Sequence, residues 1–445
     1  MRAIRTVAAA ALAAAVLASA ACTGGGSAAV PTSAAPSTTA AAPTSPDPSP
    51  SPVATGSGSA IDALHTLCTL PKLTVGPPAR QHGPAPPFVQ IVERIAAAHR
   101  GLDFLHDVPV SVGTDAELDA RLGTILGASI SEEQLARRTR AWRTIGVIPP
   151  EADLSDAIHA YYRGQVLGFY VPETGELVAT GSNADPSLVD GVVLAHELTH
   201  ALDDQHFGLV RVDRLAATCR DELSAAALGA VEGSAQFFAI SAIPDLRPVA
   251  TGTNPSFGGG DLEGVPPFVR ALQGWPYTAG TSFIQHRYEE GGTSAVNEVM
   301  RHLPVSTEQI LHPERYPNDT PQPLDVPDLS AALGAGWHDL DVMEIGEAWL
   351  QMALALRIEG PVLARATPGW DGGIYRAWTD GRRTAVVLRT VWDTPTDAQE
   401  FAQAMRRWIG EGSSPAEVVG VEGAGVDVAF ATDAATLEAL AAAVD

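Results

Sequence analysis

Apolar residues recur at helical spacing along much of the chain. Between Phe88 and His99 they stand at Phe88, Ile91, Val92 and Ile95, which places them on one face of a helix. A stretch rich in glycine and proline at residues 244–267 predicts a surface connection. Helical spacing also predicts helices at residues 115–126, 131–145, 221–240, 278–289, 293–302, 341–358, 396–409 and 433–444.

Short β-rich runs lie among these helices. Gln165–Val171 and Glu176–Thr180 flank the turn residues Pro172–Gly175, a pattern typical of a β-hairpin. Further strands are predicted at residues 108–112, 374–378, 384–391 and 426–431. The mixture predicts an α+β fold, with a main domain at residues 61–333 and a C-terminal α+β subdomain at residues 334–445.

The first 22 residues have the pattern of an export signal. Arg2 and Arg5 precede an apolar run at residues 7–18, and small residues lead into Cys22. This arrangement resembles a bacterial lipobox, which implies a lipoprotein-type signal peptide at residues 1–22 and lipidation of Cys22. Ordinary cleavage near Ala21, with release of the protein, is the alternative.

Residues 23–60 are almost entirely Ala, Ser, Thr, Pro and Gly. Such a segment has too few apolar side chains to offset the entropy lost on ordering, so it predicts a disordered linker. We therefore expect an extracytoplasmic protein, held at the cell membrane through its lipid or secreted.

Composition narrows the possible partners. The 445 residues carry 28 Lys+Arg and 52 Asp+Glu, a formal net charge of −24. A chain this acidic is repelled by nucleic acid and by anionic lipid. We therefore expect membrane contact only through the N-terminal anchor.

Beyond Cys22, the chain has two cysteines, Cys68 and Cys219, which we expect to form a disulfide in an oxidising compartment. Two buried free thiols are the alternative.

The segment at residues 190–207 carries the chemistry. It contains the pattern H-E-x-x-H as His196, Glu197 and His200, among apolar residues that predict a helix. Residues four apart lie on one helix face, so both imidazoles can bind one zinc ion. Glu197 then borders the open metal position, where it can act as general base toward a metal-activated water and later as general acid.

A third ligand must come from elsewhere, and two candidates compete. His206 follows His200 by six residues, the histidine spacing of an extended zinc motif, but Asp203 occupies the position where that motif has glycine. The other candidate is Glu232, on the next predicted helix, after an interval long enough for a turn and a returning helix. We favour Glu232.

Residues 196–205 resemble the active-site helix of thermolysin and other gluzincin metallopeptidases, and Glu232 resembles their downstream glutamate ligand. The wider chain resembles a group of exported bacterial proteins regarded as gluzincin-like zinc peptidases. The matching blocks are residues 168–172, 196–202, 231–233, 277–283, 306–314 and 369–372. The resemblance implies a zincin-like core that binds one zinc ion. It also implies that the predicted hairpin provides an edge strand for an extended peptide.

One position departs from the thermolysin pattern. Gln236 stands where that type has an aspartate that orients a ligand histidine, and Asp204 or Asp221 are possible substitutes. The sequence also leaves open which residue would donate a hydrogen bond to the oxyanion of a tetrahedral intermediate. The downstream candidates are Tyr277, His286, Tyr288 and His312.

The sequence therefore predicts a zinc-dependent peptidase outside the cytoplasm that acts on a peptide or protein substrate. A catalytically silent surface lipoprotein that binds a peptide or cell-wall component is the main alternative. A zinc hydrolase acting on a non-peptide amide is a third hypothesis. Trp370, in Gly-Trp-Asp-Gly, is interpreted as a packing anchor at a turn.

Overall fold

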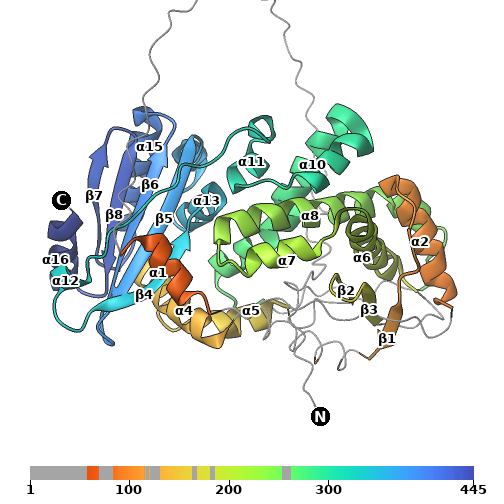
Figure 1. Cartoon of the computed structure of the whole chain (residues 1–445), viewed down its shortest axis with the longest axis horizontal. Coiled ribbons are helices and arrows are strands. Elements are labelled where there is room, and N and C mark those ends of the chain that lie inside the picture. The colour runs from red at the N-terminus through yellow and green to blue at the C-terminus, as the bar shows by residue number, and fades with distance from the viewer. Residues whose placement is uncertain are drawn as a thin grey trace, which may run out of the picture.

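The structure is a computed structural model that describes residues 58–69, 84–114, 116, 120, 131–162, 168–180, 186–252 and 262–444. It confirms the α+β class: a mainly helical part with a three-stranded sheet lies beside a five-stranded antiparallel sheet (Figure 1). The signal peptide at residues 1–22, Cys22, residues 23–57 of the expected linker and most of the helix expected at 115–126 lie outside the described residues.

The five-stranded sheet has the order β4-β5-β6-β8-β7. Its strands are β4 (His338–Glu344), β5 (Trp370–Thr379), β6 (Thr384–Trp392), β7 (Ala416–Glu422) and β8 (Gly425–Ala431). Alternation along β6 divides its side chains between two cores: Val386 and Leu388 join one, and Ala385 and Val387 join the other. Both faces of the sheet are therefore covered.

Helices from distant parts of the chain cover these faces. Trp142, Trp349 and Phe401 pack in one core, on α4 (Glu132–Ile145), α13 (Glu347–Ala355) and α15 (Pro395–Gly410) respectively. The opposite core includes Leu64 of α1 (Ala60–Leu67) and Leu440 of α16 (Ala434–Val444). The expected boundary at residues 333 and 334 thus separates segments that share a core. Trp370 is 1% exposed within the first core, as expected of a packing anchor.

Several predicted elements differ from the structure. The helix expected at residues 341–358 is wrong over its first part, because Asp341–Glu344 belong to β4 and α13 begins only at Glu347. The two helices expected at 278–289 and 293–302 are parts of α10 (Pro267–Arg301), which is interrupted at Gly291 and Gly292. Strand β7 and helix α5 (Leu154–Tyr162) were not predicted.

The helical part is built around α6 (Leu188–Phe207), α8 (Asp221–Ser241) and α10 (Figure 1). Ser187 caps α6: its Oγ accepts from the Asp190 N–H, and Asp190 in turn accepts from the Ser187 N–H. Further helices are α2 (Pro87–Arg100), α7 (Val210–Ala216), α9 (Ile243–Leu246), α11 (Thr307–Leu311), η1 (Pro313–Arg315), α12 (Ser330–Leu333) and α14 (Gly360–Ala366).

Helix α8 is long and apolar enough, by composition alone, to cross a membrane. Of its apolar window, 67% is buried inside the protein. The buried residues include Glu232. The apolar character of α8 is therefore that of a core helix.

The three-stranded sheet has the order β1-β3-β2. Its strands are β1 (Val110–Gly113), β2 (Gly168–Val171) and β3 (Glu176–Thr180). The predicted hairpin is confirmed, since β2 and β3 pair antiparallel, and β1 pairs parallel with β3. Within the described residues β2 is an edge strand, and it packs next to α6.

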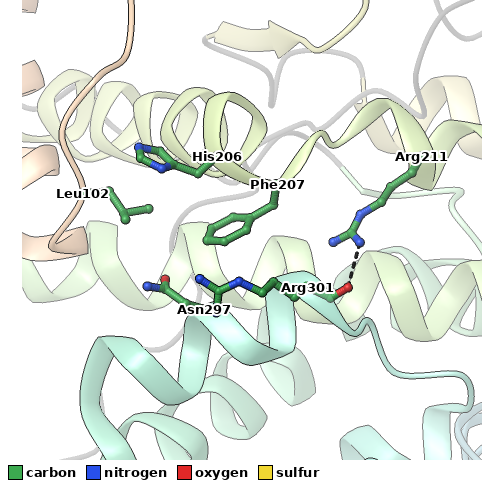
Figure 2. A pocket seen from close by; sticks show the side chains of 6 residues that line it. All are labelled: Leu102, His206, Phe207, Arg211, Asn297 and Arg301. Atoms are coloured by element: carbon green, nitrogen blue, oxygen red, sulfur yellow. Dashed lines mark hydrogen bonds between the residues drawn. The ribbon is translucent and has the colours of Figure 1, made fainter.

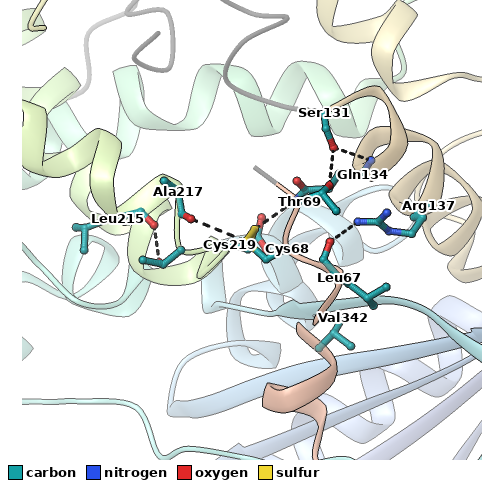
Figure 3. Close-up of a disulfide and its surroundings, with 12 residues drawn as sticks. Leu67, Cys68, Thr69, Ser131, Gln134, Arg137, Leu215, Ala217, Cys219 and Val342 are labelled. Atoms are coloured by element: carbon teal, nitrogen blue, oxygen red, sulfur yellow. Dashed lines mark hydrogen bonds between the residues drawn. A yellow bond between two sulfur atoms is a disulfide. The ribbon is translucent and has the colours of Figure 1, made fainter. Parts of the chain in front are cut away.

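A disulfide joins Cys68, just after α1, to Cys219, between α7 and α8 (Figure 3). The two Cα atoms are 5.9 Å apart. The bond ties the segment that packs on the five-stranded sheet to the connection that leads into α8. It thereby links the two parts of the molecule covalently.

Candidate metal centre

Helix α6 presents His196 and His200 on one face. The two side chains are fully buried, and their Nε2 atoms lie 3.0 Å apart. The i, i+4 spacing directs both imidazoles to the same point. Because α6 is capped at Ser187 and packed along most of its length, these positions are held by a rigid element.

Helix α8 brings the third group. Glu232 Oε2 lies 3.1 Å from His196 Nε2 and 3.5 Å from His200 Nε2. Four ligands at 2.0–2.1 Å around zinc would lie about 3.3–3.4 Å from one another, the edge of the tetrahedron. The three ligand atoms have nearly this separation, so the donor set fits a single tetrahedral cation.

His206 lies elsewhere. Helix α6 continues to Phe207, and His206 Nε2 donates to the main-chain oxygen of Asp103 at 2.8 Å. The helix is not broken at Asp203, which is buried and accepts from Arg100 Nε and Ser234 Oγ. Of the two candidates for the third position, the structure therefore brings Glu232 to the histidines.

The Nδ1 atoms of the two histidines have few hydrogen-bonding groups around them. Among the described residues, His196 Nδ1, His200 Nδ1 and Gln236 Oε1 have no hydrogen-bond partner in good geometry, although Gln236 lies close enough to His196 to act on its pKa. Of the proposed substitutes, Asp221 forms an ion pair with Arg138, whereas Asp204 accepts from the Tyr170 hydroxyl at 2.8 Å. Neither aspartate makes a hydrogen bond to the two histidines.

The electrostatics favour the protonation states that bind a metal. Burial lowers the pKa of His196, which favours the neutral imidazole. Burial acts to raise the pKa of Glu232, but the contacts with His196 and His200 outweigh it, and the net shift is downward. A neutral imidazole and an ionised carboxylate are the forms in which these side chains bind metal ions.

Glu197 lies beside this cluster and is 1% exposed. Its Oε2 accepts from the main-chain N–H of Tyr170, in β2, at 2.7 Å, while Oε1 has no hydrogen-bond partner. Burial, followed by the charge of Glu232, raises the pKa of Glu197 well above its usual range. The carboxyl group is thus oriented through one oxygen, and the described residues offer the other oxygen no partner.

Of the four oxyanion candidates, the structure brings Tyr277 to the cluster. Its ring centre is 6.0 Å from that of His196. His286 pairs with Glu290, and His312 pairs with Glu347. Tyr288 is 38% exposed and packs on Phe237 and Phe238.

Sequence reasoning did not find the main-chain contact between Tyr170 and Glu197. A main-chain donor carries no residue signature, so the only available signal was the matching block at residues 168–172. Tyr162 was also missed. It lies close enough to Glu232 for that charge to add to the effect of burial, which raises the tyrosine pKa.

Within the described residues the small sheet ends next to Glu197 in β2, whose four residues are all buried. The N–H of Leu177 in β3 donates to Pro109, on the β1 side. Its partner in β2, Tyr170, therefore directs its own N–H and C=O away from β3, which is the arrangement at a non-hydrogen-bonded antiparallel pair. Gly168, two residues earlier, has the same orientation.

A family model matches the C-terminal part of the chain and does not extend to the candidate metal centre. Residues 338–441 match the model of a family described as a domain of unknown function (DUF8575). This match runs from β4 into α16 and includes none of the residues around His196. The chain matches no curated protein and no solved structure.

Proposed function

We propose that this protein is a zinc-dependent peptidase of the gluzincin type, with a zincin-like core. The observation that supports it is the convergence of His196, His200 and Glu232 within 4.8 Å, with Glu197 directly beside them. Two imidazoles and a carboxylate are the protein ligands of zinc in such hydrolases. In the proposal these three residues hold one zinc ion.

When bound, zinc would act as a Lewis acid that polarises the substrate carbonyl and makes water a better nucleophile. Glu197 would take the proton from the attacking water on Oε1, the oxygen with no hydrogen-bond partner. The Tyr170 N–H holds Oε2, so the carboxylate cannot rotate away. Glu197 would then deliver the proton to the leaving amine, for which a raised pKa is suited.

An extended peptide would bind along β2. Gly168 and the Tyr170 carbonyl are directed away from β3 and would pair with the substrate main chain. Recognition through the main chain tolerates many side chains, so we expect broad sequence preference. Because Tyr170 contacts both the peptide and Glu197, substrate alignment and the general base would be coupled through one residue.

The proposed location follows from the N-terminal sequence. The signal peptide and Cys22 favour export and lipid anchoring, with the linker holding the enzyme away from the membrane. The disulfide between Cys68 and Cys219 fits an oxidising compartment. Secretion after ordinary cleavage is the alternative location.

The ligand set is tested by zinc stoichiometry. The chain lacking residues 1–57 would be passed through gel filtration in metal-free buffer and analysed by elemental mass spectrometry. We expect about one zinc per chain, lost in His196→Ala and Glu232→Ala. His206→Ala, on the same helix, should retain the metal because that side chain contacts Asp103 instead. Equal zinc in all variants would refute the assignment.

Activity is tested separately on a library of quenched fluorescent peptides. We expect cleavage by the parent and a loss of at least about 10²-fold in Glu197→Gln, which keeps the shape but not the base. Retained zinc with no cleavage of any peptide, together with recovery of an intact bound peptide, would instead support the catalytically silent surface lipoprotein.

A further inference from the structure

A second group of polar side chains gathers at the C-terminal end of α6. The pocket there encloses about 290 Å³. It is lined by Leu102, His206, Phe207, Arg211, Asn297 and Arg301 (Figure 2). Two of these residues are arginines and none is an aspartate or glutamate. In a chain of net charge −24, this pocket is a local exception.

Arg211 lies in this pocket with only part of its guanidinium group paired. Its Nη1 donates to the main-chain oxygen of Arg301 at 3.0 Å, whereas Nε and Nη2 are buried and have no hydrogen-bond partner among the described residues. Within the described part of the chain, no carboxylate forms an ion pair with Arg211. Buried polar atoms without partners are uncommon in native proteins, so two of them on one charged group favour a further acceptor at this place.

The neighbouring groups are arranged to receive an anion. Asn297 Oδ1 already accepts from Arg100 Nη1 at 2.7 Å, so the amide NH₂ remains as the donor of that side chain. Arg301 pairs with Glu298 through Nη1 and lies over the Phe207 ring, 5.6 Å from its centre. The donors therefore share the pocket with the apolar surfaces of Phe207 and Leu102.

We propose that this pocket binds an organic carboxylate through Arg211, with Arg301 and Asn297 as further donors. A guanidinium matches a planar carboxylate with two parallel hydrogen bonds, and the apolar walls suit a short hydrocarbon group better than a hydrated phosphate. The carboxylate could belong to a free small acid or to a peptide terminus.

The pocket is distinct from the metal centre. His206 follows His200 by six residues, which on an α-helix is about 9 Å along the axis and roughly 240° around it. The pocket is not lined by His196, His200 or Glu232. Carboxylate binding in this pocket therefore does not depend on zinc or on peptidase activity.

Binding would be measured by calorimetry in low-chloride buffer, using the chain stripped of metal by a chelator. The probes are N-acetyl-leucine and N-acetyl-leucinamide, which differ only in the carboxylate. We expect the acid to bind and the amide not to bind. Arg211→Gln should weaken the acid at least about tenfold, as expected for loss of a charge-assisted hydrogen bond. Arg270→Gln, an exposed arginine of α10, should bind as the parent does.

Arg301→Gln is a second variant, and we do not expect it to disturb folding because the Arg301 side chain is 50% exposed. It should also weaken the acid, with an unchanged unfolding temperature in the absence of ligand. Acetate and inorganic phosphate are two further probes, and acetate distinguishes a free small acid from a peptide terminus. Acetate that binds as tightly as N-acetyl-leucine would favour a free small acid, and tighter N-acetyl-leucine would favour a peptide terminus. Binding of phosphate alone, equal binding of the amide, unchanged binding in Arg211→Gln or no binding would each overturn the proposal.

Discussion

Tyr277 lies beside His196 although the two residues are far apart in the sequence. Its ring is 6.0 Å from that imidazole, and burial, together with the charge of Glu232, raises its pKa well above the usual range. The phenol is therefore neutral and keeps its proton at ordinary pH. A neutral hydroxyl at this position is suited to donate to an oxyanion.

If the proposed reaction is correct, Tyr277→Phe should lower kcat by roughly 10²–10³-fold, the usual cost of removing one oxyanion donor. Zinc content should not change, because the tyrosine is outside the ligand set. The measurement is steady-state cleavage of a peptide substrate. Tyr288→Phe, on the same helix but 38% exposed, is the control and should retain full activity. A kcat unchanged in Tyr277→Phe would exclude this role.

Arg100 and Asp203 form an ion pair in which both side chains are fully buried. Arg100→Met leaves a buried carboxylate unpaired, so unfolding free energy should fall by about 3–5 kcal/mol. Urea unfolding measures the change. Arg94→Met, on an exposed position of the same helix, should change it by less than about 0.5 kcal/mol. Similar stability of the two variants would contradict a structural role for the pair.

The close approach of helices α8 and α10 supports the candidate metal centre. A Cβ on Gly280 would lie 2.0 Å from the main-chain oxygen of Gly229, and a Cβ on Gly233 would lie 2.2 Å from that of Gly280. Only glycine allows the backbones to come so close. Gly233 follows Glu232, and Gly280 lies three residues after Tyr277. The helix contact therefore sets the spacing between these two site residues.

Gly280→Ala should separate the two helices and lower the unfolding free energy by at least about 1–3 kcal/mol, because main-chain atoms rather than a flexible side chain must move. Zinc affinity should fall as Glu232 shifts. Chemical unfolding and metal titration test both effects. Gly274→Ala lies on the same helix, and its nearest neighbour would be 3.8 Å away, so it should be neutral or stabilising. Equal behaviour of the two variants would refute the contact.

At the scale of the whole molecule, Glu222 connects the helical part with the elements around the five-stranded sheet. This residue of α8 accepts from the main-chain N–H and the hydroxyl of Thr307 at the start of α11. Thr307 Oγ1 in turn accepts from the N–H of Ala348 in α13. Burial is the largest influence on Glu222 and raises its pKa from 4.5 to about 8. The junction is thus built with a protonated carboxyl group.

This junction predicts the dependence of stability on pH. Because the pKa of Glu222 is higher in the folded state, its contribution is fully present below about pH 4.5 and is lost as pH rises through about 8. Burial also raises the pKa of Glu308 to about 8. Each group contributes a slope of at most about 1.4 kcal/mol per pH unit.

Glu222→Gln should therefore reduce this slope between pH 5.5 and 8 by up to about 1.4 kcal/mol per pH unit, as measured by urea unfolding at several pH values. Glu417→Gln replaces an exposed carboxylate of β7 and serves as the control. A parent protein whose stability is flat or rises over this interval would contradict the protonated junction.

Local sequence patterns correctly predicted those helices and strands that depend mainly on residues close together in the chain. The helix that carries His196 and His200 and the hairpin at β2 and β3 follow from periodicity and turn residues. The segment at Asp341–Glu344 was assigned wrongly, because a short apolar run fits a buried strand as well as a helix. Its pairing with β5 decides between them.

By itself, the sequence determined the helical spacing of the two histidines, the position of Glu197 between them and the α+β class, because these depend on residues close together in the chain. Tertiary structure decided that Glu232 rather than His206 joins the histidines, that Tyr170 orients Glu197 and that Arg211 faces a pocket without a carboxylate. These contacts join residues far apart in sequence, and one of them uses a main-chain group. Their formation depends on how α6, α8, α10 and the small sheet pack, which no local pattern encodes.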